Sequence, residues 1–246
     1  MGSELGGSVP ESATFTHALD TLKQEGSNIL LVGSTATSAH KAACRRLLGE
    51  SDEPRCRLFV VTEQSHNSHG VDHVCSHGHT LESEHATTRV IVRSADENGE
   101  VSDHERSPRH GRNHGSTSEP TVTESVVGTE LLSTLGTEVI ETVSAFNEEA
   151  GGLEPSELRV CVDSLTPLLV DHRSENVFRL LHVMTSWVRQ VNGMGHFHLP
   201  VATDHDAVNL LEPLFDAIVE VRVRDDVSEQ RWHLRDQRTT SDWIPL

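Results

Sequence analysis

Short apolar runs alternate with segments of helical periodicity along this chain. Three such runs, at residues 28–32, 57–62 and 158–162, each lead into a glycine or an acid. This pattern is typical of buried parallel strands whose carboxyl ends lie at one edge of a sheet. Segments 38–48 and 174–191 place apolar residues on one side of a helix. The alternation predicts an α/β fold with a mostly parallel central sheet flanked by helices.

The second half of the chain extends this pattern. Residues 195–200 predict a further strand, and residues 207–215 predict a short helix. Runs 217–223 and 230–234 predict a C-terminal β-hairpin. A long helix is predicted over 122–149. Its apolar face would consist of Val126, Val127, Leu131, Leu135, Val139, Val143 and Phe146.

Composition divides the chain into a tail, one domain and an insertion. We expect residues 1–13 to be a disordered tail and residues 14–246 to form a single domain. Within this domain, residues 64–120 hold nine of the seventeen histidines. A run rich in β-forming residues, 88–92, interrupts this segment. Residues 94–120 contain almost nothing that a core would bury, so we expect a mobile insertion.

The charge of the chain indicates the kind of cellular environment and limits the classes of partner that it can bind. The formal net charge is −18, and lysine occurs only at Lys23 and Lys41. Such an acidic composition favours a cytoplasm at high salt, where screening reduces self-repulsion, and it disfavours nonspecific binding to nucleic acid. No apolar run approaches the roughly 20 residues of a membrane helix, and the polar N-terminus is unlike a secretory leader. Four cysteines without a CxxC pair indicate a reducing compartment, and Cys161 is interpreted as a small buried hydrophobe.

Asp163 and Ser164, at the end of the third apolar run, are the first candidates for chemistry. In open α/β sheets ligands bind at the carboxyl edge of the strands, and an acid there typically meets Mg²⁺ bound to a nucleotide. The alternative is that Asp163 only caps the strand end. Gly33 similarly suits either a phosphate loop or a necessary turn. Ser34 to Ser38 lead into a helix, whose N-terminal N–H groups favour an anion.

The order of these elements resembles the RecA-fold ATPases, and most closely their KaiC-type branch. The local match comprises CVDSLTPLL at 161–169, GHFHLP at 195–200, FDAIVEVRV at 215–223 and QRWHLRDQRTT at 230–240. The chain also resembles small RecA-like proteins of halophilic archaea. The resemblance implies a RecA-like fold with vestigial nucleotide-binding positions. These are Gly33, Ser34, Ser38, Lys41, Glu63, Asp163, Ser164 and Arg238.

The sequence departs from the pattern of active members at several of these positions. In G-x-x-x-x-G-K-[ST], counted from Gly33, the second glycine is Ser38, the lysine is Ala39 and the hydroxyl residue is His40. Lys41 comes two residues late, which turns its side chain by roughly 200° on a helix. We therefore expect no catalytic residues and no cofactor beyond weak binding of ATP and Mg²⁺.

Two further departures concern the acids after the second strand and the C-terminal tail. The two adjacent acids of the KaiC-type branch correspond to Glu63 and Gln64, and an amide cannot accept a proton from the attacking water. In the tail, the family's lysine falls on Asp236 and its arginine on Arg238. This charge reversal puts in doubt the contact that the family's pair makes with a neighbouring subunit's nucleotide.

The histidines suggest an alternative function. Potential metal ligands are close together at His69, His73, Cys75, His77 and His79, although a polar His-rich loop can bind metal adventitiously. His196 and His198 alternate with Phe197 and are interpreted as hydrogen-bonded sheet residues rather than ligands. The leading hypothesis is a catalytically inactive RecA/KaiC-like domain. It would act as a cytoplasmic interaction or signal-transduction module, with a protein partner or as a homo-oligomer. The alternatives are an atypical ATPase and a metal-binding protein using the His-rich segment.

Overall fold

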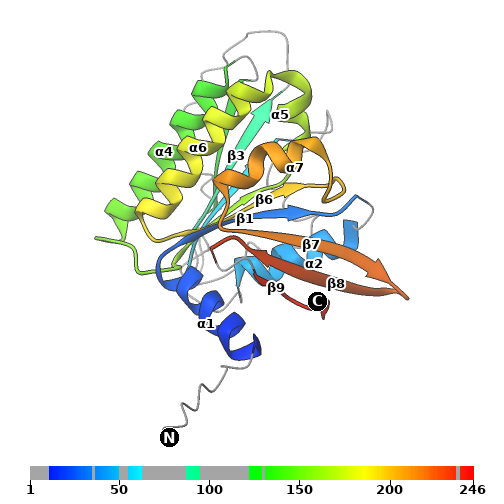
Figure 1. Ribbon diagram of the computed structural model, residues 1–246. Helices are drawn as coiled ribbons and strands as arrows, with labels where there is room; N and C mark the ends of the chain where they lie inside the picture. The colour runs from blue at the N-terminus through cyan, green and yellow to red at the C-terminus, as the bar shows by residue number, and fades with distance from the viewer. Residues whose placement is uncertain are drawn as a thin grey trace, which may run out of the picture.

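The computed structural model describes most of the chain as one sheet with helices on both faces (Figure 1). The described residues are 11–34, 37–49, 55–62, 87–94, 122–128, 131–236 and 239–246. The helices are α1 (Glu11–Gln24), α2 (Thr37–Leu48), α4 (Leu132–Glu149), α5 (Thr166–Asp171), α6 (Ser174–Gln190), α7 (Asp206–Leu211) and the 3₁₀ turn η1 (Glu212–Leu214). The strands are β1 (Ser27–Val32), β2 (Cys56–Val61), β3 (Thr87–Ser94), β4 (Val122–Gly128), β5 (Leu158–Val162), β6 (Met194–Leu199), β7 (Ala217–Arg224), β8 (Val227–Leu234), β9 (Thr239–Thr240) and β10 (Ile244–Pro245).

The sheet is parallel from β7 to β4 and antiparallel at its C-terminal end. Its order is β10-β8-β7-β1-β6-β5-β2-β3-β4, with β9 also paired to β8. Strands β1, β2 and β5 are mutually parallel, so their carboxyl ends lie at one edge, with β6 between β1 and β5. The predicted α/β class, the parallel central sheet and the C-terminal hairpin are therefore confirmed.

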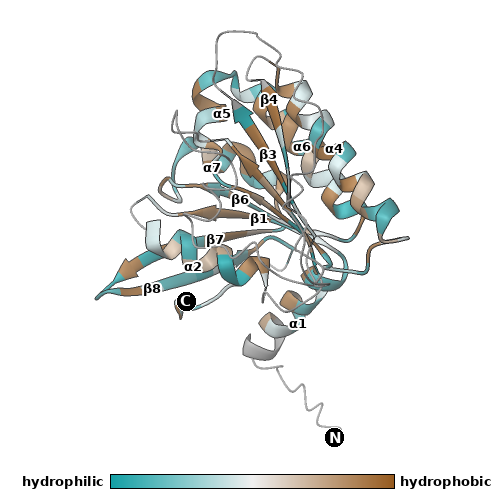
Figure 2. Cartoon of the chain, turned by 180° about the vertical axis from the view of Figure 1, so that it is seen from behind, coloured by the Kyte–Doolittle hydropathy of each residue, from teal (hydrophilic) through white to brown (hydrophobic). Residues whose placement is uncertain are grey.

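Alternating side chains of the central strands supply three clusters of buried residues, one on the face covered by α4 to α7 and two on the face covered by α1 and α2. Leu30 and Val32 of β1 join a large cluster under α4, α5, α6 and α7, whereas Ile29 and Leu31 face α1 and α2. Figure 2 shows the central strands as hydrophobic and much of β8 as hydrophilic. A strand with both faces covered requires an almost continuous apolar sequence, as β1 has. The consequence for the site is that the face of β6 opposite Phe197 must meet α2.

The predicted long helix over 122–149 is wrong in its first part. Residues 122–128 form strand β4, which pairs in parallel with β3, and helix α4 begins only at Leu132. Val127 is buried, whereas Val126 is 66% exposed, as expected for alternating strand positions. The β-branched residues of this segment fit a pleated surface, and the unpaired edge of β3 supplies a partner. Helix α1 begins at Glu11, three residues before the expected start of the domain.

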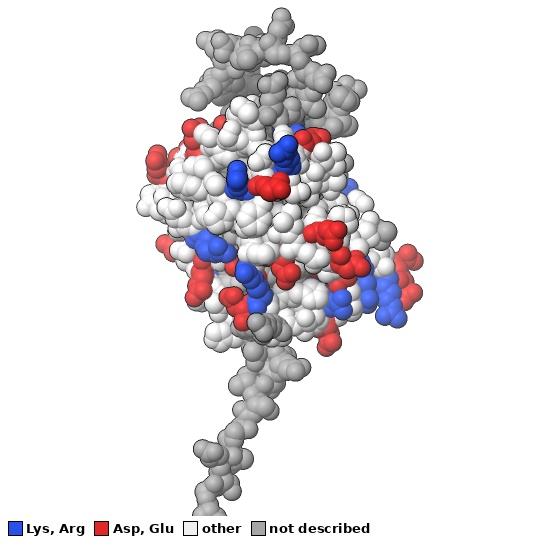
Figure 3. Space-filling model, turned by 45° about the horizontal axis from the view of Figure 1, so that its top comes forward, with Lys and Arg blue, Asp and Glu red and all other residues white. Residues whose placement is uncertain are grey.

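The surface is mixed in charge on the face shown in Figure 3, where acidic and basic side chains are interspersed without a continuous basic patch. Several arginines pair with acids, for example Arg231 with Glu220 (Nη2–Oε2, 2.6 Å). No helix in the described part of the chain is long and apolar enough to cross a membrane.

Candidate functional site: the carboxyl edge and a buried Cys–His cluster

Asp163 lies at the carboxyl edge of the sheet and is held there by Thr62. The backbone N–H and the hydroxyl of Thr62 both donate to Asp163 Oδ1, each over 2.8 Å. The same hydroxyl also contacts the carbonyl oxygen of Ser164. Ser164 is buried, and its Oγ accepts a hydrogen bond from the Thr166 N–H at the start of α5. These contacts join the ends of β2 and β5. Asp163 and Ser164 therefore stabilise the structure whether or not a ligand binds.

Gly33 is required by close packing of the backbone. Its φ of +148° is one that residues with a Cβ rarely adopt, and a Cβ there would lie 2.4 Å from the carbonyl oxygen of Val221 on β7. Its N–H donates to the Val201 carbonyl over 2.9 Å. The N–H group that would begin a phosphate cradle is therefore already paired. Ser34 and Ser38 are exposed on either side of the turn.

His40 fills the start of α2 on its inner side. The ring is buried, with Nε2 2.9 Å from the carbonyl oxygen of Gly33 and Nδ1 3.2 Å from Nδ1 of His198. Burial, followed by the neighbouring His198, lowers the pKa of His40 to about 4, so the ring is neutral near pH 7. Ala39 beside it is fully buried. Lys41 is half-buried on the next position of α2.

Several sequence-predicted positions lie outside the described residues. They are Glu63, Gln64, Arg238 and the metal-ligand candidates His69, His73, Cys75, His77 and His79. The predicted mobility of residues 94–120 lies outside them as well, except at Ser94, which is the last residue of β3. Among the described candidates, Asp163 and Ser164 both bond to the hydroxyl of Thr62, and Gly33 lies next to the ring of His40.

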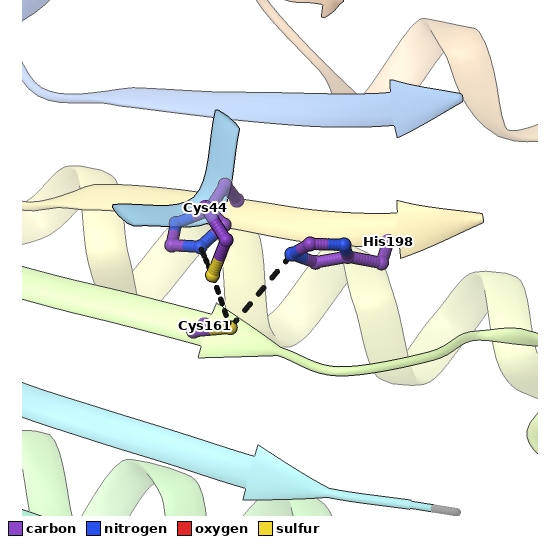
Figure 4. Close-up of side chains that lie close together, drawn as sticks. Cys44, Cys161 and His198 are labelled. Carbon is purple, nitrogen blue, oxygen red and sulfur yellow. Dashed lines mark hydrogen bonds between the residues drawn. The ribbon is translucent and has the colours of Figure 1, made fainter. Parts of the chain in front are cut away.

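The structure brings together four buried side chains that were not predicted to meet. Cys44 comes from α2, Cys161 from β5, and His196 and His198 from β6. One ligand atom of each lies within 4.8 Å of those of the other three. Figure 4 shows Cys44 approaching Cys161 from the helix, with His198 reaching the same point along the sheet. This arrangement is a compact Cys₂His₂ donor set under the helix that begins at the glycine turn.

Sheet register explains why these donors share a face. Cys161 pairs directly with His196 on the adjacent parallel strand, and His198 follows two residues later, so all three point toward α2. Phe197 points the other way into the large core. Cys44 lies one helical turn after His40, which puts both side chains on the inner face of α2.

The two thiols have opposite electrostatic surroundings. Burial raises the pKa of Cys44, but the hydrogen bond from Cys161 and the adjacent His196 and His198 outweigh it, so this pKa lies well below its usual value. The pKa of Cys161 is raised by the hydrogen bond with Cys44 and by burial. The two sulfur atoms lie 3.5 Å apart, and the lower pKa makes Cys44 the stronger nucleophile of the pair.

A known protein family matches most of the chain, including the residues that form this site. Residues 26–221 match the model described as "Family of unknown function (DUF7504)". The chain belongs to the DUF7504 family. The matched range contains α2, β5 and β6, and hence the whole Cys₂His₂ cluster. No curated protein matches the sequence of this DUF7504 member.

The fold of this DUF7504 member is similar to a solved KaiC-like structure. The crystal structure of a KaiC-like protein from the hyperthermophilic archaeon Pyrococcus horikoshii OT3 matches with a TM-score of 0.51 at 11% sequence identity. The match covers 90% of this chain and 85% of the other. At this identity the similarity shows the fold alone, and it supports the RecA/KaiC-like architecture predicted from the sequence.

The cluster of this DUF7504 member was missed because each part of it has an ordinary interpretation. Cys161 fits a buried strand as a small apolar residue, and His196 and His198 fit a sheet as polar residues. The only local signal for the cluster was residue spacing. His196 and His198 are two residues apart on a strand, and His40 precedes Cys44 by four residues on a helix. Each spacing places two donors on one face. Only the pairing of β5 with β6 and the packing of α2 place the two faces together.

Proposed function

We propose that this chain is a RecA/KaiC-like domain that does not hydrolyse nucleotides and acts as an intracellular interaction or regulatory module. The observation that carries this proposal is the position of His40. Its ring bonds both Gly33 and His198 at the start of α2, where an ATPase of this fold needs a lysine and a hydroxyl for the phosphates and Mg²⁺. Ala39 supplies no charge, and its buried position is closed to a solvated ammonium group.

The surroundings of the acid support the same conclusion. Asp163 Oδ1 accepts two hydrogen bonds from Thr62, which join two strand ends. The N–H of Gly33 is bonded to Val201. These positions therefore fit an Mg²⁺-nucleotide poorly, because Ala39 carries no charge for the phosphates and the N–H of Gly33 is already bonded.

The partner is expected to be a protein, including a second copy of this chain. A net charge of −18 repels nucleic acid, and on the face shown in Figure 3 the charges are interspersed rather than arranged as a basic track for a phosphate backbone. Static light scattering in molar KCl, with and without ATP, tests the homo-oligomer. A monomer under all conditions would leave only a different protein as the partner.

The decisive test of catalysis is phosphate release by the pure protein in molar KCl with ATP and Mg²⁺. We expect a rate equal to that of the buffer blank, and at most weak ATP binding in calorimetry. Asp163→Asn is the matched variant. Turnover that disappears in Asp163→Asn would overturn the proposal and favour the atypical ATPase, whereas turnover unaffected by this change would identify a contaminating enzyme.

A further inference from the structure

We propose that Cys44, Cys161, His196 and His198 bind one Zn²⁺ ion in a closed, structural site between α2 and the sheet. This inference is independent of whether the domain binds nucleotide, because it rests on donors beneath α2 rather than on the carboxyl edge. It also differs from the His-rich segment, since none of the four ligands lies between residues 64 and 120.

The distances between donors fit a tetrahedral ion. Zinc bonds of about 2.3 Å to sulfur and 2.0–2.1 Å to nitrogen place tetrahedral ligand atoms roughly 3.3–3.8 Å apart. Here Cys44 Sγ lies 3.5 Å from Cys161 Sγ and 3.0 Å from His196 Nε2, and Cys161 Sγ lies 3.9 Å from His198 Nε2. All four ligand atoms lie within 4.8 Å of one another. Small rotations of the side chains would complete the tetrahedron without moving the strands.

Hydrogen bonds behind the cluster orient one of the ligands. The carbonyl oxygen of Gly33 can only accept, so Nε2 of His40 carries a proton and donates to it. In the neutral ring, Nδ1 of His40 is then an acceptor, and Nδ1 of His198 must donate to it. The lone pair of His198 is therefore on Nε2, the atom that faces Cys161. A second-shell acceptor that fixes the tautomer of a histidine is a regular feature of protein zinc sites.

The charge and the chemical softness of the four ligand atoms determine which metal ion the site favours. On binding, the two thiols release their protons to solvent, and two thiolates balance the charge of one divalent cation. This balance of charge is needed because all four ligands are buried, where an uncompensated charge is costly. Two sulfur and two nitrogen donors in a tetrahedral arrangement favour Zn²⁺ over the oxygen-seeking Mg²⁺ or Ca²⁺. Four protein ligands leave no open position for water, so the site ties α2 to β5 and β6 rather than performing catalysis.

The test is the metal content of the intact chain, purified with zinc and then dialysed against metal-free molar KCl. We expect one Zn²⁺ per chain, lost in Cys161→Ser and His198→Ala and retained in Cys56→Ser and Cys75→Ser. Cys56 is the matched control because it is a strand cysteine outside the cluster. His40→Ala should weaken zinc affinity by about 10–100-fold, since it removes the group that orients His198.

Cobalt substitution of the unaltered protein keeps the proposal testable if a variant fails to fold. We expect thiolate-to-cobalt charge-transfer absorption with the intensity of two Co–S bonds, and the visible bands of a tetrahedral ion. A spectrum with a single Co–S bond that disappears in Cys75→Ser would place the metal on the His-rich segment and overturn the proposal. It would also be overturned by zinc no higher than the blank after reconstitution, or by a Cys44–Cys161 disulfide in the purified protein.

Discussion

Replacing Gly33 by alanine tests whether this glycine serves backbone packing or a phosphate. The new Cβ would lie 2.4 Å from the carbonyl oxygen of Val221, which belongs to the backbone of β7 and cannot turn aside. Holding a residue other than glycine at φ +148° costs about 1–3 kcal/mol. Displacing β7 from β1 adds about 1–3 kcal/mol, as overpacking does elsewhere. The central expectation is a loss of about 4 kcal/mol in the free energy of unfolding.

Thermal unfolding followed by circular dichroism in molar KCl measures this loss. For a chain of this size, each kcal/mol lowers Tm by about 2–4 °C, so we expect a decrease of about 8–16 °C. Gly151→Ala is the control, because Gly151 also has a positive φ (+69°) but a Cβ there meets nothing within 4 Å. The control should cost only the left-handed conformation, about 1–2 kcal/mol.

Equal losses in Gly33→Ala and Gly151→Ala would refute the packing argument. Mg²⁺-ATP provides an independent check, because a ligand that binds the folded state raises Tm. We expect no such rise in the unaltered protein. A rise that Gly33→Ala abolishes would show that Gly33 acts in phosphate binding after all.

Three further predictions follow from charge, a thiol and two threonines. Folding should weaken as KCl is diluted from molar to millimolar, because 38 acids against 20 bases repel one another when unscreened, and unfolding midpoints that do not change would contradict this. Burial, and then the Glu157 carboxylate, raise the pKa of Cys56 to about 11. Iodoacetamide labelling of Cys56 in the folded chain should therefore rise about tenfold per pH unit above pH 8, whereas labelling of the urea-unfolded chain levels off near pH 9. The same shift contributes stability that is fully present below about pH 8.5 and is lost as pH rises toward 11. Thr62→Val should lower the free energy of unfolding by about 1–3 kcal/mol in urea titrations, because it removes the hydroxyl that bonds Asp163 Oδ1 and the Ser164 carbonyl oxygen just after β5. Thr88→Val should be neutral or stabilising, since the buried Thr88 hydroxyl has no hydrogen-bond partner among the described residues.

The sequence was sufficient for the fold where local pattern and tertiary environment agree. Strands such as β5 and the amphipathic helix α6 were predicted to within a residue or so, because both faces of the strand and one face of the helix are buried. β4 was missed because its valines continue, by coincidence, the helical spacing of α4. What makes residues 122–128 a strand is the open edge of β3, a partner that the local sequence does not contain.

The candidate site was predictable only at its carboxyl edge. The acid after an apolar run locates Asp163 directly, since strand ends are local features. The Cys–His cluster joins Cys44 to residues 117 and 152 positions away. The sequence pattern within a single helix or strand does not predict that α2 packs across β5 and β6. That information is in the strand order, which becomes visible only when the sheet is assembled.

The strand order also determines which parts of the sheet can form while the chain is still being synthesised. β1 is central, yet its two hydrogen-bonded neighbours, β6 and β7, begin only at Met194 and Ala217. A ribosome therefore releases residues 27–32 long before either neighbour exists, whereas β2, β3, β4 and β5 are complete by residue 162. Pairings of such large sequence separation form slowly. We expect the β2–β5 half of the sheet to form first on the nascent chain. The apolar strand β1 then waits for release of the C-terminal segment and is the part of the newborn protein that most needs a chaperone.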